Sequence, residues 1–112
     1  MFKVTQSPTF WATVKAEVRD ENGKQLEVSW RQQFKRLPVS EVQSMTEVIQ
    51  ENKQHDADFL VQVTTDWKEV GDDDGNALSY SEDELRKLVD AGFSRAMLDA
   101  FYGGYPKAKL KN

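Results

Sequence analysis

The chain has no cysteine, a single histidine among its 112 residues, and no long hydrophobic run. Without cysteine, the protein cannot form disulfides, thiolate-bound zinc sites, iron–sulfur clusters or a thiol nucleophile. The single histidine, His55, excludes a multi-histidine metal site, and its polar surroundings favour a surface or helix-capping role. No apolar stretch approaches the roughly 18 residues of a membrane-spanning helix. These absences predict a protein without a cofactor and without membrane contact.

An excess of one charge is also lacking, because 15 basic residues nearly balance 19 acidic ones and leave a formal net charge of −4. This charge is too small for a DNA mimic, and the sequence shows no strongly basic face for nucleic acid. The first eight residues lack the apolar stretch of a signal peptide, so we expect a soluble, cytoplasmic protein. The length fits one domain, predicted over residues 1–106 and followed by a basic, flexible tail over residues 107–112.

Apolar and polar residues alternate over residues 10–18 and again over residues 26–34, the pattern of half-buried strands. Between these runs, Asn22-Gly23 tolerates the positive φ angles of a tight hairpin. We therefore predict a β-hairpin over residues 9–36. Its first strand should turn one set of residues toward the core, with Trp11 on the opposite face: Phe10, Ala12, Val14, Ala16 and Val18.

Helical spacing replaces this alternation over residues 39–102. Ser40 with Gln43 predicts a capping box at the start of a first helix of about three turns, and the polar stretch 50–55 should break or expose the chain. A second helix, capped by Asp56 or Asp58, should bury a stripe that consists of Phe59, Leu60, Val63 and Trp67. The whole pattern predicts an α+β fold, with an N-terminal antiparallel hairpin or small sheet followed by about four short helices.

Two further helices follow an acidic turn. Ser81 with Glu84 makes a second capping box, and Tyr80 before it with Leu85 after it has the spacing of a hydrophobic staple. Gly92 should end this third helix. Ser94 should begin a last one, which turns Met97, Leu98 and Phe101 inward.

The acidic turn, residues 71–76, is the first candidate for chemistry. Asp72, Asp74 and Gly75 resemble positions three, five and six of a calcium-binding loop. Val70 and Ser81 stand at positions one and twelve, where such a loop needs carboxylates. A polar turn is therefore favoured over a dedicated metal site, and a weak divalent-cation site is the alternative.

Catalytic groups are otherwise hard to find. Paired carboxylates can hydrolyse glycosides, but the glutamates of the first half lie among lysines and arginines on predicted surfaces: Glu17, Glu27, Glu41 and Glu47. Gly103-Gly104 follows a helix rather than opening one, so it is no phosphate loop. The serines have no histidine at a plausible location. We predict that the protein is not an enzyme; a small metal-dependent enzyme would require the acidic turn to bind a divalent ion.

Surface aromatic residues are the remaining signal. Trp11, on the outward face of the hairpin, either covers part of a helix or anchors an interface, and Tyr102 and Tyr105 are equally candidates for an interface. The hairpin also presents an unpaired edge, which must be covered or used for assembly. We therefore predict self-association.

Residues 56–112 resemble the tail assembly chaperones of long-tailed, siphovirus-type bacteriophages. The shared pattern is a helix that ends in tryptophan, an acidic loop with aspartate and glycine, and an aromatic–serine step that opens the next helix. The matching positions are Trp67, Asp73 (or Asp74), Gly75, Leu78, Tyr80, Ser81, Glu84 and Leu85. Phe101-Tyr102 followed by the basic tail fits as well, whereas the N-terminal half carries no motif.

The resemblance implies a non-enzymatic protein that binds the tape measure protein, the long helical rod that sets tail length. Such a chaperone keeps the rod soluble in the host cytoplasm, passes it to the major tail protein, self-associates, and is absent from the mature virion. The alternative is a structural virion protein, such as a tail-completion or head–tail joining component.

Overall fold

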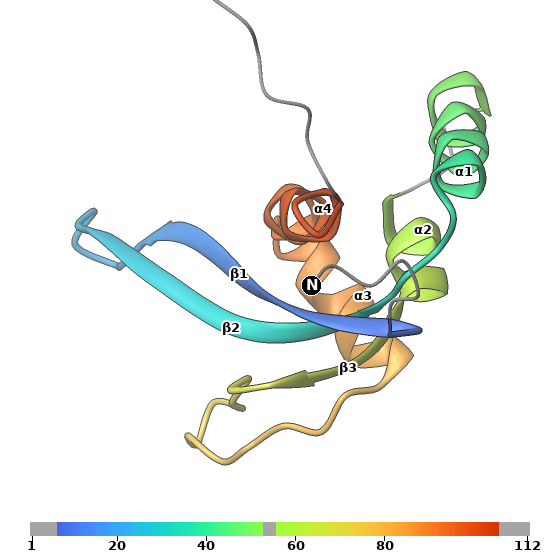
Figure 1. The fold of residues 1–112 in the computed structure, drawn as a ribbon. Helices are drawn as coiled ribbons and strands as arrows, with labels where there is room; N and C mark the ends of the chain where they lie inside the picture. Colours follow the sequence, from blue (N-terminus) through green and yellow to red (C-terminus); the bar gives the residue numbers. More distant parts are fainter. Residues whose placement is uncertain (1–6, 53–55, 106–112) are drawn as a thin grey trace, which may run out of the picture.

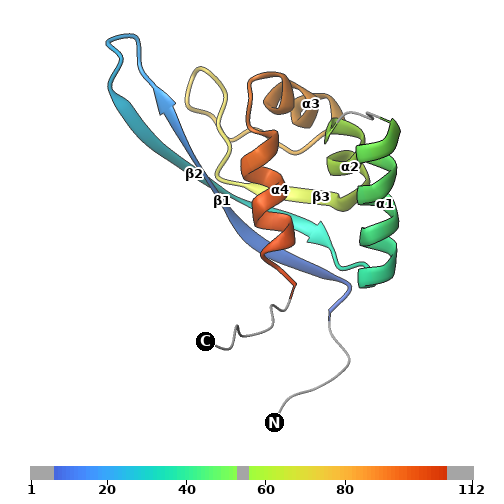
Figure 2. The same ribbon diagram turned by 90° about the horizontal axis from the view of Figure 1, so that it is seen from above.

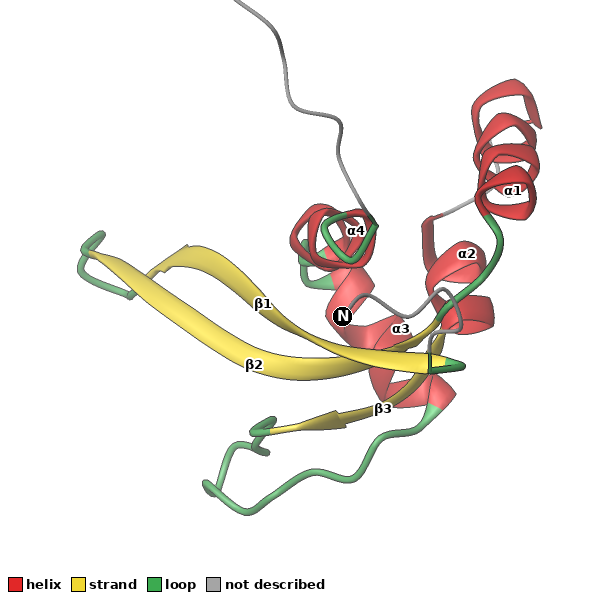
Figure 3. Ribbon diagram, viewed as in Figure 1, coloured by secondary structure: helices red, strands yellow, loops and turns green. Residues whose placement is uncertain are grey.

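A computed structural model of the chain describes residues 7–52 and 56–105. It confirms the predicted α+β arrangement, with a hairpin first and helices after it (Figure 1). Figure 3 shows the strands in yellow and the helices in red. The elements in chain order are β1 (Thr9–Arg19), β2 (Gln25–Lys35), α1 (Val39–Asn52), α2 (Asp56–Val63), β3 (Thr64–Lys68), α3 (Glu82–Asp90) and α4 (Ser94–Tyr102).

The predicted hairpin is confirmed. β1 and β2 pair antiparallel along their whole length, with Val14 opposite Trp30. At the turn, the Asp20 carboxylate accepts hydrogen bonds from the backbone N–H groups of Asn22 and Lys24, each at 2.9 Å, and Gly23 has a φ of 82°. The turn end of the hairpin projects beyond the helices, and α4 crosses the sheet near its middle (Figure 2).

A third strand corrects the sequence analysis, which placed Trp67 at the end of a helix. α2 ends at Val63, and β3 continues directly from it and pairs antiparallel with β2, giving the sheet order β1-β2-β3. The register shifts between Gln33 and Phe34, so Thr65 is an extra residue on the β3 side. β-branched Thr64 and Thr65 suit a strand, and pairing with β2 overrides the helical spacing of the apolar residues.

The first helix also differs from its predicted boundaries. α1 begins at Val39, and the N–H of Val42 donates to the carbonyl of Pro38, so Pro38 rather than Ser40 takes the N-cap position. The helix runs to Asn52, beyond the predicted start of the break. His55 and the basic tail lie outside the described residues.

The third and fourth helices follow their sequence signals. The Ser81 hydroxyl accepts the N–H of Glu84 at 3.2 Å, which confirms the predicted N-cap of α3, while the Glu84 carboxylate pairs with Lys87. After α3, Gly92 has a φ of 102° and Phe93 N–H donates to the Leu88 carbonyl, as in a Schellman motif. α4 begins at Ser94, as expected.

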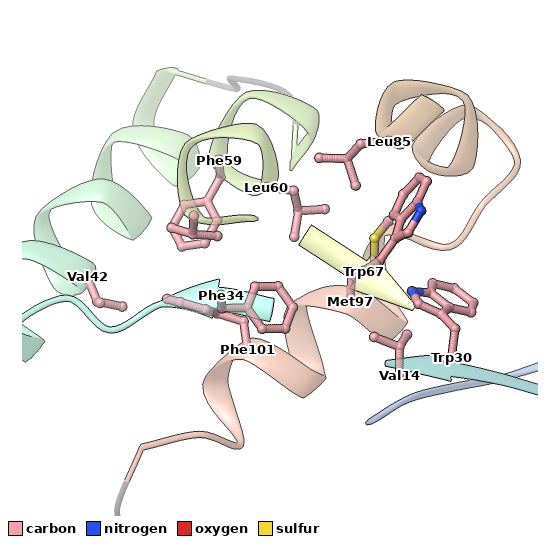
Figure 4. Close-up of a cluster of buried hydrophobic side chains, with 11 residues drawn as sticks. Val14, Trp30, Phe34, Val42, Phe59, Leu60, Trp67, Leu85, Met97 and Phe101 are labelled. Carbon is pink, nitrogen blue, oxygen red and sulfur yellow. The ribbon is translucent and has the colours of Figure 1, made fainter. Parts of the chain in front are cut away.

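The core lies between the sheet and the helices (Figure 4). It is formed by the inward side chains of both long strands, Trp67 of β3, and one face of each helix, namely Val14, Trp30, Phe34, Val42, Phe59, Leu60, Val63, Trp67, Leu85, Met97 and Phe101. Rings from different elements meet edge to face, such as Phe34 and Phe101 at 5.4 Å between centroids. This packing fixes the positions of the two surfaces described next.

Candidate protein-binding surfaces

The family-like segment from Trp67 to Leu85 forms one connection between β3 and α3. Trp67 Nε1 donates to the carbonyl of Leu78 at 2.8 Å, and the Tyr80 ring meets the Trp67 ring edge to face at 5.1 Å. Leu85 is fully buried. Burial raises the pKa of the Tyr80 phenol above its ordinary value of 10.0, and the negative charge of Glu82 raises it further. Trp67, Leu78, Tyr80 and Leu85 therefore have a structural role: their contacts hold the connection between β3 and α3 in place.

The acidic turn in this segment is ordered by its own backbone. The Asp72 carboxylate accepts hydrogen bonds from the N–H groups of Asp74 and Asn76, both at 2.9 Å, and Gly75 has a φ of 82°. Asp73 is exposed. Within residues 7–52 and 56–105, no group of three or more histidine, aspartate or glutamate side chains is placed to hold a metal ion. In the same ranges, no helix is long and apolar enough to cross a membrane.

A groove between α1 and the end of α4 brings together two of the predicted interface residues. Its volume is about 590 Å³, and it is lined by Val39, Val42, Gln43, Thr46, Glu47, Tyr102 and Tyr105. Val39 leaves 56% of its surface exposed at one end of the groove. The groove therefore combines an apolar floor with polar side chains along α1.

Hydrogen bonds hold both tyrosines in the groove wall. The Tyr102 hydroxyl shares a hydrogen bond of 2.9 Å with the Thr46 hydroxyl. The Tyr105 hydroxyl accepts the N–H of Leu37 and donates to the carbonyl of the same residue, both at 3.0 Å. These hydrogen bonds tie the two rings to α1 and to Leu37, which precedes it.

Close packing holds Gly104 and Tyr105, which follow α4. A Cβ atom at Gly104 would overlap the ring of Phe10, so only glycine fits there. Arg36 donates from Nη1 to the Gly104 carbonyl at 3.2 Å, and its guanidinium lies 4.7 Å from the centre of the Phe10 ring. Tyr105 is thereby positioned through β1, β2 and α4 together.

The third predicted interface residue, Trp11, lies on the other side of the sheet. It belongs to the outer face, which we define as the residues of β1, β2 and β3 that point away from the core. Trp11 is partly buried there, with Lys68 Nζ 4.4 Å and Arg31 Cζ 5.8 Å from its ring centre. The charged members of this face are Lys15, Glu17, Arg19, Glu27, Arg31, Lys35, Asp66 and Lys68.

Comparison with known proteins confirms the family that the sequence resembles. A family model described as phage tail assembly chaperone matches residues 1–112. The chain belongs to the phage tail assembly chaperone family. No curated protein and no solved structure matches the chain. The match covers the N-terminal hairpin of the chaperone as well, where the sequence shows no motif.

Two polar features of the chaperone were missed by sequence reasoning. Gln32 is fully buried; its amide accepts from Trp30 Nε1 at 2.9 Å and donates to the Thr64 hydroxyl at 3.0 Å. The sequence did carry a signal for Gln32, because a glutamine at a core-facing position of an alternating strand indicates a buried hydrogen-bonded side chain. Thr46, the partner of Tyr102, gave no signal, because only the tertiary fold brings α1 next to α4.

Proposed function

We propose that this chaperone binds the tape measure protein through the groove between α1 and α4 and keeps that protein soluble during tail assembly. The proposal rests mainly on the family match over the whole chain. The groove supports it, because it offers apolar and polar side chains to which an amphipathic helix could bind. A long helix with an apolar stripe aggregates when it is exposed, and it is shielded when the stripe lies in an apolar groove.

The groove has the composition that helix binding requires. Val39, Val42 and the tyrosine rings can receive apolar side chains, while Gln43 and Glu47 can contact polar residues beside the stripe. The part of α1 that lines the groove, residues 39–47, is about 14 Å long and can align with roughly two and a half turns of a partner helix. Many copies along a rod, each with a modest contact, would then give strong overall binding.

The remaining parts of the proposal follow from the same role. We infer that the protein acts in the host cytoplasm without enzymatic activity, self-associates, transfers the tape measure protein to the major tail protein, and is absent from the mature virion. A structural virion component is the alternative. Mass spectrometry of purified particles separates the two, because a tail-completion or joining protein would be found in them.

Co-expression with the tape measure protein of the same phage tests the groove. We expect the wild-type chain to increase the soluble yield of the tape measure protein and to co-purify with it. Val39→Asp should abolish both effects, because it places a carboxylate at the apolar end of the groove. Val48→Asp is the matched control, since Val48 is exposed on the same helix but does not line the groove.

The outcomes distinguish whether the chain binds the tape measure protein at all and whether the groove is the binding surface. An unchanged soluble yield with the wild-type chain contradicts tape measure binding. A yield that rises equally with wild-type and Val39→Asp chains shows that another surface binds. Circular dichroism of both variants establishes that they fold.

A further inference from the structure

The outer face of the sheet gathers positive charge around an indole ring. In the β1–β2 register, Arg31 and Lys35 lie diagonally opposite Trp11, and Lys68 on β3 lies opposite Arg31. Lys15 continues the same face along β1. This concentration of cations stands in a chain whose formal net charge is −4.

Among the described residues, no ion pair within 4 Å joins these cations to a carboxylate. Glu17 and Glu27 face each other near the hairpin turn, which leaves Asp66 as the acidic residue nearest the cations around Trp11. In the described part of the chain, the ion pairs within 4 Å involve other residues: Arg86 with Asp58, Lys87 with Glu84, and Arg95 with Asp99. In the described residues, the outer face therefore offers cationic groups that contact the Trp11 ring but have no carboxylate partner within 4 Å.

The opposite charge is concentrated immediately after β3. Residues 69–83, here called the acidic segment, contain six of the 19 acidic residues and none of the 15 basic ones, so their formal charge is −6 and that of the remaining chain is +2. Glu69, Asp73 and Asp74 are exposed. Because Glu69 follows Lys68 directly, the two charged surfaces adjoin each other.

We propose that the outer face binds the acidic segment of a second copy of this chain. Self-association is part of the proposed function, and this inference assigns the surfaces that produce it. Since both surfaces adjoin in every copy, a two-fold arrangement lets each copy present its acidic segment to the other copy's cations. Trp11 adds apolar contact at the centre, and charge complementarity sets the register. The three carboxylates on the outer face disfavour nucleic acid as the occupant.

Paired charge reversals test this assignment without the tape measure protein. The base-reversed variant carries Arg31→Glu and Lys68→Glu, and the acid-reversed variant carries Asp73→Lys and Asp74→Lys. Lys24→Glu, at the exposed hairpin turn, is a single-charge control outside both surfaces. Mass is measured by light scattering and sedimentation at low and high salt, and circular dichroism checks that each variant folds.

We expect the wild-type and Lys24→Glu chains to associate at low salt and to dissociate at high salt. Each reversed variant alone should show a dissociation constant raised by about tenfold or more, because several exposed charge pairs become repulsive. An equal mixture of the two variants should associate again, since each then meets opposite charge.

Any of three results would overturn the inference: a wild-type chain that stays monomeric at low salt, reversed variants that associate like the wild type, or a mixture of the two variants that stays monomeric. A short single-stranded oligonucleotide that binds the wild-type chain but not the base-reversed variant, while the protein alone is monomeric, would identify the outer face as a nucleic-acid site. A monomeric wild-type chain would also contradict the self-association in the proposed function. None of these results bears on binding of the tape measure protein in the groove, so failure of the two proposals can be told apart.

Discussion

The two faces of the sheet arise from the same alternation in β1 and β2, yet they are built from different interactions. On the inner face, Val14 and Phe34 are fully buried under the helices. On the outer face, Trp11 is partly buried under the side chains of cations. The inner face specifies the fold through tight packing, whereas the outer face is held by exposed, salt-sensitive contacts. Substitutions at neighbouring positions should therefore have very different effects.

The largest difference is expected for aromatic residues on opposite faces. Phe34→Ala should lower the free energy of unfolding by about 3–5 kcal/mol, because it opens a cavity in a core that cannot collapse fully. Trp11→Ala should cost about 1–2 kcal/mol, since solvent can fill the vacated space. Urea unfolding followed by circular dichroism measures both. Equal losses would show that the two faces are packed alike.

Adjacent glutamines give a second comparison. Gln32→Met should cost about 1–3 kcal/mol, because the buried Trp30 Nε1 then has no acceptor and Thr64 loses its donor. Gln33→Met removes hydrogen bonds to Thr9 and Thr65 at the more accessible outer face, where water can replace them, and should cost below about 0.5 kcal/mol. Thermal unfolding of the two variants decides the point. A larger loss for Gln33→Met would contradict the conclusion that the buried hydrogen bonds of Gln32 contribute more to stability than those of Gln33.

The smallest effect concerns the cation over Trp11. Lys68→Met keeps the length of the side chain but removes its charge, and should lower stability by about 0.5–1 kcal/mol. Lys24→Met at the hairpin turn is the control and should change stability by less than about 0.3 kcal/mol. Chemical denaturation of both variants at dilute concentration, which keeps the proposed self-association from contributing, gives the comparison.

Local signals predicted the hairpin, the cap at Ser81 and the Gly92 terminus, because each depends on residues close together in the chain. β3 was not predicted, since the apolar residues up to Trp67 have helical spacing. Trp67 lies in a strand because its segment pairs with β2, which is distant in sequence. The groove between α1 and α4 was not predicted for a similar reason. Tyr102 and Tyr105 were recognisable as surface aromatics, but nothing near them in sequence indicates that α1 forms the other wall.

The segment that resembles the family illustrates the same limit. Sequence reasoning identified the residues from Trp67 to Leu85 without indicating what they do in space. In the structure, the indole of Trp67 bonds the Leu78 carbonyl and contacts the Tyr80 ring, so these positions are explained by the architecture of one connection. In this chain, the residues that indicate the family therefore do not indicate where its binding surface lies.

The joint at Leu37 has a mechanical consequence. The Tyr105 hydroxyl bonds both backbone polar groups of Leu37, and the N–H of Arg36 donates to the carbonyl of Pro8 at 2.8 Å. Both ends of the described chain are thus fastened at one place, next to the Phe10 and Phe101 rings. A pull on Pro8 or on Tyr105 would be transmitted directly to the cluster of aromatic rings, so the described part of the chain should resist unfolding from either end.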